Sequence, residues 1–457
     1  MIKTRLMGSS ALGAAGLLLL GQGAVSTAAA QDSLFERDRN ISVLERYRPE
    51  YAAPGVRAGQ FIVKPRLDLG VGWTSNAFAL SDVPSDRGLE RFEDEADSFV
   101  FLRPSIRGET VWSRHAIGFS AYAEAIKNNR FQNETITNLG AAINGQLDLT
   151  RTAALFGGAS IDRRHEDRQT QTAGFLFEEP VEYTRTRAYL GLQHEMGRVR
   201  YKTRIDFADY DFSDALLLPE AVAVPRARVD QDYRDHQRYS LLGQVSLAIT
   251  RDFSIFLEGE INAREYDQET PYDRDSEGWR VAAGTEFDVT RLSRGRVSLG
   301  YFEQDYEDIR LQTANGLSLD AQLEWFPTEL TTITLTGRRG IDETAVINAG
   351  GYVTTEARLR VDHELRRNVL LYAYGAVGTV DYPDAFPLDE EEGERLTDQS
   401  IDRRGLGVGG TYLFNPNVSA SLDYRYREQD VAVDLFNGGF NADYNSHDLL
   451  LTLTLQR

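Results

Sequence analysis

Cysteine is absent from the 457 residues of this chain, and methionine, tryptophan and histidine are scarce, at 3, 4 and 6 residues. Without thiols the protein has no disulfides, no thiolate metal site and no thiol nucleophile. A lipid anchor on a cysteine is excluded for the same reason. The composition fits a secreted chain that does not rely on disulfides.

Long hydrophobic runs are also absent, apart from one near the N-terminus. Residues 1–30 carry Lys3 and Arg5, then an apolar segment centred on Leu17–Leu20, then three alanines before Gln31. This pattern predicts a cleaved signal peptide over residues 1–30, because a membrane-spanning helix needs roughly 20 apolar residues. The mean hydropathy of -0.40 excludes a helical membrane bundle. It does not exclude a β-barrel, in which only alternate residues meet lipid.

Positive charge is in deficit. Lysine and arginine total 50 against 70 aspartates and glutamates, a net charge of -20. Loss of Lys3 and Arg5 with the signal peptide removes two positive charges from -20 and leaves -22. Nucleic-acid binding needs a basic surface and is therefore excluded. The acidity is interpreted as a solvated surface, with attraction of divalent cations near lipopolysaccharide as the alternative.

Catalytic and metal-binding motifs are lacking. The histidines are scattered along the chain, at His115, His165, His194, His236, His363 and His447. No Gly-x-Ser-x-Gly or His-Glu-x-x-His sequence occurs, so the chain is not expected to be an enzyme. Asp273 and Asp275 begin like an EF-hand loop, but Gly284 stands where a bidentate glutamate is required. No catalytic, cofactor or metal site is predicted.

Residues 139–161, LGAAINGQLDLTRTAALFGGASI, show the pattern that dominates the chain. Aliphatic Leu139 and Ile143 share one face of an extended chain, whereas Gln146 falls on the other. A period of two is typical of a β-strand and of no helix. After the polar turn Thr150–Thr152 the alternation resumes, so this stretch is predicted to be one β-hairpin.

Similar hairpins recur to the C-terminus, joined by longer polar and often acidic segments. Alternating runs lie near 60–74, 98–110, 115–127, 136–149, 153–163, 182–196, 199–210, 235–249, 253–265, 278–290, 295–306, 315–326, 330–339, 352–365, 369–381, 402–413, 418–428 and 445–456. They number 18, and two weak runs, Val181–His194 and Thr331–Arg338, leave 16 open. Tight turns at one end and long connections at the other predict an all-β fold, a transmembrane antiparallel up-and-down β-barrel. A soluble β-sandwich array is the competing fold.

Residues 31–58 are charged and turn-rich, with Pro49 and Pro54 and little alternation. We interpret them as a periplasmic lead or a plug segment inside the lumen, with a poorly ordered terminus as the alternative. Alternation begins at Gln60, so the barrel is assigned to residues 59–457.

The start of the barrel resembles that of a known family. The matching positions are Arg48, Pro49, Tyr51, Gly55, Gly59, Phe61, Pro65, Gly70 and Asn76. They fit an RPxYxxxG-like lead and a GxFxxxPxxxxG first strand ending in asparagine, which is similar to the type 2 outer-membrane β-barrel porin family of Gram-negative bacteria. The resemblance implies an outer-membrane barrel and, from some relatives, a link to exopolysaccharide production. It assigns no functional residues.

The four tryptophans fall at predicted strand ends. Trp73 and Trp279 are placed at the outer rim, and Trp112 and Trp325 beside short turns at the periplasmic rim. Amphipathic rings at both interfaces are expected of an aromatic girdle. Ordinary core aromatics of a sandwich are the alternative.

Strand parity also predicts the lining of the lumen. A basic wall is expected from three adjacent strands, formed by Arg185, Arg187, Arg200, Lys202, Arg204, Arg234 and Arg238, with His236 on the same face. An acidic wall is expected from the following strands, formed by Glu258, Glu260, Glu286, Asp288, Asp320 and Glu324. Two walls of opposite sign would make a selectivity surface for polar or anionic solutes, an acidic polysaccharide included. Internal salt bridges that only stiffen the barrel are the alternative.

Two functions follow from this fold. One is a porin-like channel that passes polar solutes or exports exopolysaccharide across the outer membrane, since such a barrel is wide enough for water. The other is a non-conducting structural barrel that acts as an anchor or assembly partner. The expected partners are outer-membrane lipid and lipopolysaccharide, the barrel-insertion machinery, and polysaccharide or small polar solutes. The expected location is the cell outer membrane.

Overall fold

The computed structural model describes residues 34–35, 40–79, 95–168, 177–216, 228–268, 272–289, 292–344, 350–382, 399–431 and 443–457. The predicted signal peptide, residues 1–30, lies outside these ranges. Within them the chain is built from strands and two short 3₁₀ turns. No helix in the described ranges has the length and apolar character needed to cross a membrane.

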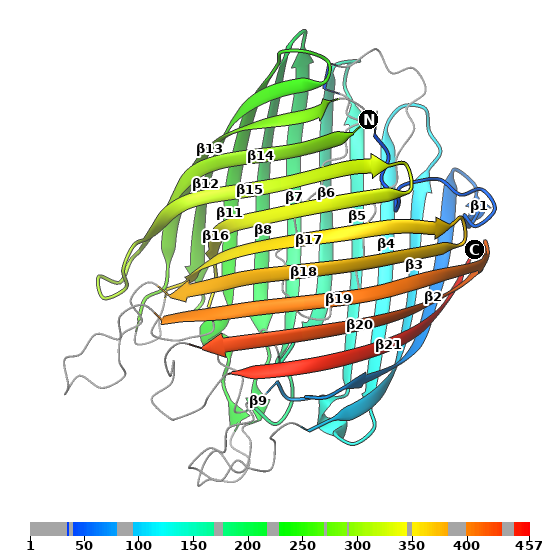
Figure 1. Ribbon diagram of the computed structural model, residues 1–457. Helices are drawn as coiled ribbons and strands as arrows, with labels where there is room; N and C mark the ends of the chain where they lie inside the picture. Colours follow the sequence, from blue (N-terminus) through cyan, green and yellow to red (C-terminus); the bar gives the residue numbers. More distant parts are fainter. Residues whose placement is uncertain are drawn as a thin grey trace.

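Eighteen long strands of the described chain form one closed antiparallel barrel (Figure 1). They are β2 (Phe61–Thr74), β3 (Asp97–Thr110), β4 (Ala116–Asn128), β5 (Ile136–Asp148), β6 (Ala153–His165), β7 (Glu182–Met196), β8 (Val199–Phe212), β11 (His236–Ala248), β12 (Phe253–Tyr266), β13 (Ser276–Val289), β14 (Ser293–Tyr306), β15 (Ala314–Thr328), β16 (Thr331–Asp342), β17 (Tyr352–Arg366), β18 (Val369–Tyr382), β19 (Gln399–Asn415), β20 (Val418–Val431) and β21 (Tyr444–Gln456). They contain 12 to 17 residues each, enough for the roughly 9–11 residues of a tilted membrane-spanning strand. The predicted fold is confirmed with 18 strands, because the two weak runs form β7 and β16.

The last strand closes the barrel onto the first. Leu453 of β21 lies opposite Leu69 of β2, and Leu451 lies opposite Val71. Cross-strand pairs of apolar side chains stabilise a sheet by roughly 0.2–1 kcal/mol each. The leucine repeat of the final strand therefore fixes the register in which the sheet closes.

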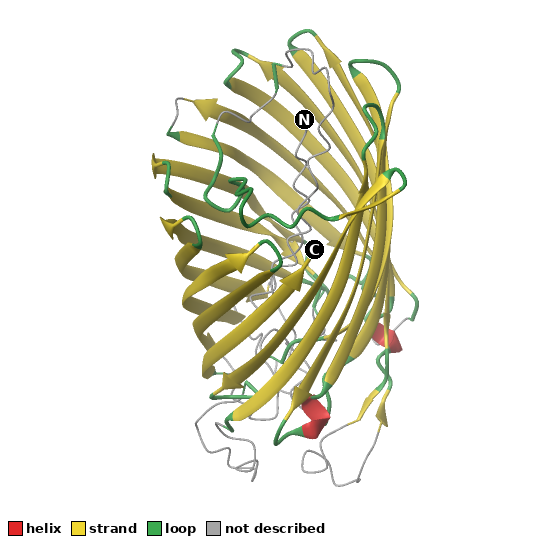
Figure 2. Ribbon diagram, turned by 90° about the vertical axis from the view of Figure 1, so that its right-hand side faces the viewer, coloured by secondary structure: helices red, strands yellow, loops and turns green. Residues whose placement is uncertain are grey.

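Short and long connections alternate along the barrel. The tight-turn end includes the two-residue turns 197–198, 367–368 and 416–417. The opposite end, called the long-connection end, holds two 3₁₀ turns (η1, Gln132–Glu134; η2, Asp232–Arg234) and a small hairpin of β9 (Ala215–Leu216) and β10 (Arg228–Val229). Both 3₁₀ turns lie at the lower end of the barrel in Figure 2. Both chain ends of the barrel, Phe61 and Gln456, lie at the tight-turn end, as expected for an even number of strands.

The two faces of the sheet differ in chemistry. Large apolar side chains such as Leu299 (64% exposed) and Ile205 (59% exposed) cover the outer face. Charged and polar side chains alternate with them and point inward. Because only the outer set meets lipid, a chain of low mean hydropathy can still form a membrane barrel.

Apolar clusters inside the barrel gather at the long-connection end. One consists of Val380, Tyr382 and Ile401. Another joins Phe177 and Val181 of the β6–β7 connection to Phe212 at the end of β8 and Ala215 of the short strand β9. The second cluster packs the β6–β7 connection against the end of β8.

Candidate functional site

Six residues of the predicted basic wall lie on the inner face of three neighbouring strands. Arg185 and Arg187 lie on β7, while Arg238 lies on β11. Three more, Arg200, Lys202 and Arg204, lie on β8. Their immediate neighbours on β8 include exposed apolar Tyr201 and Ile205. Because Cβ atoms alternate between the faces of a strand, these cations face the lumen.

Arg234 departs from the prediction. It lies in the 3₁₀ turn η2, ahead of β11, where the N–H of Asp235 bonds to the carbonyl of Asp232. The Arg234 guanidinium forms an ion pair with Glu166 of the β6–β7 connection. A residue in a turn does not follow strand parity, so Arg234 ties two connections together instead of lining the wall.

The acidic wall lies on β12, β13 and β15, but it is not purely acidic. Glu258, Glu260, Glu286, Asp288, Asp320 and Glu324 occupy inward positions of these strands. The same face carries three arginines that the sequence analysis left out, Arg280, Arg294 and Arg296. The alternation of faces would have identified them. Arg280 lies an even number of residues from Glu286 on the same strand, and Arg294 and Arg296 lie directly opposite Asp288 and Glu286.

Ion pairs join the two walls. Arg200 Nη2 lies 3.0 Å from Glu286 Oε2, three strands away. Two further pairs lie within the face of the acidic wall itself. Arg296 Nη2 lies 2.9 Å from Glu258 Oε2, and Arg280 Nη2 lies 3.3 Å from Glu260 Oε2. Buried ion pairs stabilise a fold only when their geometry and their hydrogen bonds offset the free-energy cost of removing both charges from water. Much of the charge that the sequence places on the two walls is therefore neutralised locally.

Two members of the walls stand apart from this network. Within the described part of the chain, neither Lys202 nor Asp320 has an oppositely charged group within ion-pair distance. Lys202 Nζ lies 5.7 Å from the centroid of the Phe156 ring instead. Lys202 therefore leaves an uncompensated positive charge on the lumen wall, and Asp320 leaves an uncompensated negative charge.

The lead segment, defined here as residues 40–55, lies against the inner wall at the tight-turn end. In Figure 2 it runs across the upper opening of the barrel. Val43 is fully buried, and its N–H donates to Thr332 Oγ1 at 2.9 Å. The short strand β1 (Val56–Ala58) then pairs with β2 and leads into the barrel.

Charged groups of the wall hold the lead segment. Arg294 Nη1 donates to the carbonyl of Asn40 at 2.7 Å, and the same guanidinium pairs with Glu45. Arg48 Nη2 donates to Glu364 at 2.7 Å. Farther toward the N-terminus, the centroid of the Phe35 ring lies 4.4 Å from the guanidinium carbon of Arg200. Hydrogen bonds to charged groups stabilise by roughly 1.5–3 kcal/mol each, so several contacts hold the segment in the lumen.

The four tryptophans lie at the strand ends where the sequence places them. Trp73 and Trp279 lie near the long-connection end of β2 and β13. Trp325 lies near the tight-turn end of β15, and Trp112 lies in the β3–β4 turn at that end. All four are exposed on the outside. Rings in these positions match the two interfacial levels of a membrane.

Three exposed aspartates, Asp214, Asp230 and Asp232, gather near the β9–β10 hairpin with carboxylate oxygens close enough to hold a cation. The neighbouring carboxylate of Asp230 raises the pKa of Asp232. Exposed acidic groups cluster in this way without a metal, and their repulsion is relieved by solvent. Among the described residues around them, no other feature points to a ligand.

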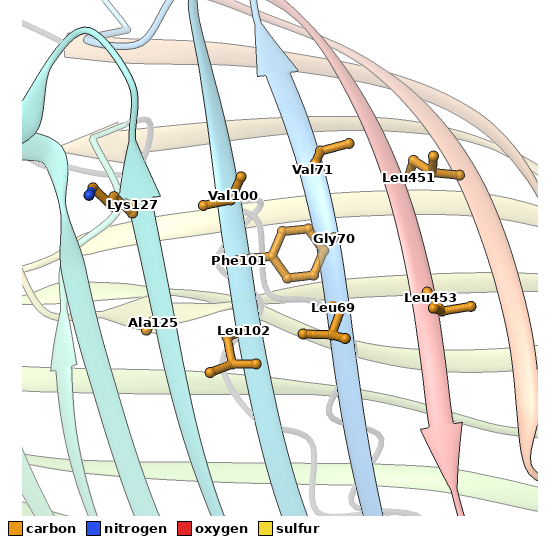
Figure 3. Close-up of a pocket in the computed structure, with 10 residues that line it drawn as sticks. All are labelled: Leu69, Gly70, Val71, Val100, Phe101, Leu102, Ala125, Lys127, Leu451 and Leu453. Carbon is orange, nitrogen blue, oxygen red and sulfur yellow. The ribbon is translucent and has the colours of Figure 1, made fainter.

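A shallow apolar groove lies on the outer face where the barrel closes (Figure 3). Leu69 and Val71 of β2 and Leu451 and Leu453 of β21 line it. Figure 3 shows Phe101 behind the strands, lying beside Gly70. Because the groove is on the lipid-facing side, it belongs to the membrane contact and not to a solute path.

A family model described as "Putative beta-barrel porin 2" matches residues 48–457. No curated protein matches the chain in sequence.

Solved structures with a similar path of the chain include three proteins of Pseudomonas aeruginosa. The siderophore receptor PirA is 9% identical with a TM-score of 0.40, over 90% of this chain and 81% of that one. A mutant ferric enterobactin receptor PfeA is 8% identical with a TM-score of 0.48, over 89% and 82%. OpdL is 12% identical with a TM-score of 0.40, over 86% and 99%. At these TM-scores the similarities carry no argument about function.

The family match covers nearly the whole described barrel, including its closing strand and the motif that begins at Arg48. The family is one of porins and not of enzymes, and its barrel belongs to the outer membrane. The chain is thus a member of the beta-barrel porin 2 family.

Proposed function

We propose that this barrel is an outer-membrane channel that passes polar solutes and favours anionic ones. The observation that carries the proposal is Lys202, a cation on the inner wall with no acidic partner among the described residues. Arg204 occupies an inward position of the same strand, and Arg187 occupies one of the adjacent strand β7. An uncompensated cation such as Lys202 in a water-filled pore raises the local concentration of anions.

In one version of this proposal the anionic solute is a polymer, an acidic exopolysaccharide that the channel exports. Alternate positions on a strand are about 6.6 Å apart, so Arg200, Lys202 and Arg204 lie in line along β8. Lys202 is the unpaired cation of the three, because Arg200 pairs with Glu286 and Arg204 pairs with Asp206. A polyanion sliding through the lumen would meet them in succession. Small anionic solutes would use the same wall one group at a time.

The lead segment supports a second candidate, a barrel with a filled lumen that serves as an anchor or assembly partner. Its contacts with Arg294, Thr332 and Glu364 place backbone inside the tight-turn end. A segment held by several charged contacts reduces the cross-section of the pore. The two candidates differ in one measurable property, which is conductance.

The test is ion selectivity in planar lipid bilayers under a KCl gradient. The Lys202→Glu variant should insert normally and shift the reversal potential toward cations, and the shift should grow at low salt because screening weakens. The matched control is Arg151→Glu, which makes the same charge change in an exposed tight turn outside the lumen. Its reversal potential should stay near that of the wild type.

Each outcome separates the candidates. A wild-type protein that inserts but carries no current favours the filled barrel. A conducting wild type whose selectivity is unchanged by Lys202→Glu would show that this wall does not select ions. Oligoglucuronate that blocks the current more strongly than neutral dextrin of equal length would support the polysaccharide form.

A further inference from the structure

Three arginines converge on one carboxylate of the inner wall. Asp162 of β6 is only 5% exposed. The Nη2 atoms nearest to its carboxylate, at 3.4 to 3.5 Å, belong to Arg164, Arg185 and Arg187. Charge-assisted N–H···O bonds are usually about 2.7–2.9 Å long. The single carboxylate is thus shared loosely among three guanidinium groups and saturates none of them.

The charge on this cluster does not balance. Three positive charges face one negative charge, and among the described residues Asp162 is the only carboxylate within ion-pair distance of Arg185 or Arg187. The buried Nε atoms of both arginines have no hydrogen-bond partner in the part of the chain that the structure describes. Burying an unpaired charged donor costs more stability than burying a neutral one. An added anion at the lumen side of the cluster would offset the surplus positive charge.

The cluster is held in place by its neighbours. The Tyr122 hydroxyl of β4 donates to Asp162 Oδ1 at 3.1 Å and accepts from Arg164 Nε at 3.0 Å. The Tyr122 ring lies over Gly140 of β5, where a Cβ would overlap it. Four consecutive strands therefore fix the donors before any solute arrives, which lowers the entropic cost of binding.

The cluster is also open to the lumen. The side chains of Arg187 and Arg164 are 42% and 36% exposed, whereas Arg185 lies deeper at 12%. An incoming group can reach two guanidinium forks from the water side without moving the wall. Guanidinium forks bind planar carboxylates and tetrahedral oxyanions in bidentate geometry.

We propose that Tyr122, Asp162, Arg164, Arg185 and Arg187 form a binding site for an oxyanion, the carboxylate or sulfate group of a solute in the lumen. In the cell this site rests on the proposed channel function, because the solute must enter the barrel to reach it. The site gives the anion preference of the channel a defined position on β6 and β7.

Binding is measured by isothermal titration calorimetry on the full-length barrel in detergent, so that conduction is not required. The probes are sodium glucuronate and sodium sulfate, with glucose as the neutral control and sodium chloride matching the ionic strength. Arg187→Gln should weaken binding of the charged probes by about tenfold, in keeping with the loss of one charge-assisted bond. Asp162→Asn should strengthen it, because the surplus positive charge rises from two to three.

The matched control is Arg360→Gln on the opposite part of the barrel. Arg360 also faces inward and lies over a tyrosine ring, but Asp362 neutralises it at 2.8 Å. This variant should bind glucuronate and sulfate as the wild type does. Heat-modifiable migration on unboiled gels verifies that every variant is folded.

The results separate the site from the channel. Failure of both glucuronate and sulfate to bind the wild type, or equal binding by wild type, Arg187→Gln and Asp162→Asn, overturns the site and leaves the channel proposal standing. Binding by a wild type that does not conduct in bilayers overturns the channel and supports the site. Preference for glucuronate identifies a carboxylate ligand, and preference for sulfate identifies a sulfate ester.

Discussion

The ring of Tyr374 on β18 lies over Gly407, its direct partner on β19, so closely that a Cβ at Gly407 would overlap the ring. The guanidinium carbon of Arg358 lies 3.9 Å from the centroid of the same ring. The arrangement of glycine, aromatic ring and cation recurs at Gly70–Phe101–Arg103, Gly140–Tyr122–Arg164, Gly191–Phe156–Lys202, Gly284–Phe256–Arg296 and Gly409–Tyr372–Arg360. Each glycine makes room for a ring against the wall, and each ring supports a cation in the lumen.

Gly407→Val should destabilise the barrel by about 1–3 kcal/mol, the usual effect of overpacking. The added side chain would push the Tyr374 ring off the wall. Urea unfolding in lipid vesicles gives the free energy. Gly243→Val is the control, since nothing lies within 4 Å of a Cβ at Gly243. Adding Tyr374→Ala to Gly407→Val should recover part of the loss, and no recovery would contradict this role of the glycine.

Leu299→Arg should lower the free energy of unfolding by about 2–4 kcal/mol, because the charge would face lipid near the middle of β14. The control is Asn144→Arg, which adds the same side chain at an exposed inward position of β5. That variant should lose far less stability. Equal losses in vesicle unfolding experiments would mean that the two faces are assigned wrongly.

Deletion of residues 34–54 should increase the single-channel conductance in planar bilayers. The deletion removes the backbone that Arg294, Thr332 and Glu364 hold at the tight-turn end. The control is Tyr47→Ser, which alters a side chain that is 75% exposed and leaves the lead segment bound. An unchanged conductance after deletion would place the lead segment outside the ion path.

Asp235 should make the stability of the long-connection end depend on pH. Burial raises the pKa of its carboxyl to about 6, although the N–H of Phe212 donates to it at 2.7 Å and opposes the shift. The pKa of an unfolded aspartate is about 3.9. Between these values the folded state binds more protons than the unfolded state, so stability falls as pH rises from about 4 to about 6.

The variant Asp235→Asn isolates this effect. The amide oxygen can still accept from Phe212, but the carboxylate charge is gone. At pH 7 the variant should unfold at a higher temperature than the wild type, and at pH 4 the two midpoints should coincide. Because the two proteins share every other titrating group, the difference between their unfolding midpoints reports the effect of Asp235. A variant that is less stable than the wild type at pH 7 would contradict the prediction.

The strands and the face on which each residue lies can be read from the order of the residues alone. The alternation of residues such as Leu139 and Gln146 is a local property, because successive Cβ atoms point to opposite sides of an extended chain. Even the weak runs that became β7 and β16 kept enough of this period to be found. The inward direction of Lys202 and Glu258 followed from the same rule.

Which inward groups meet depends on how the strands are arranged in the closed barrel. The pairing of Arg200 with Glu286 spans three strands, and the contact of Arg294 with Asn40 joins the wall to the lead segment. Such contacts depend on register, on curvature and on the path of segments without periodicity. A period of two carries none of this information. It determines the face on which each residue lies, but it does not determine which residues that side chain contacts across the barrel.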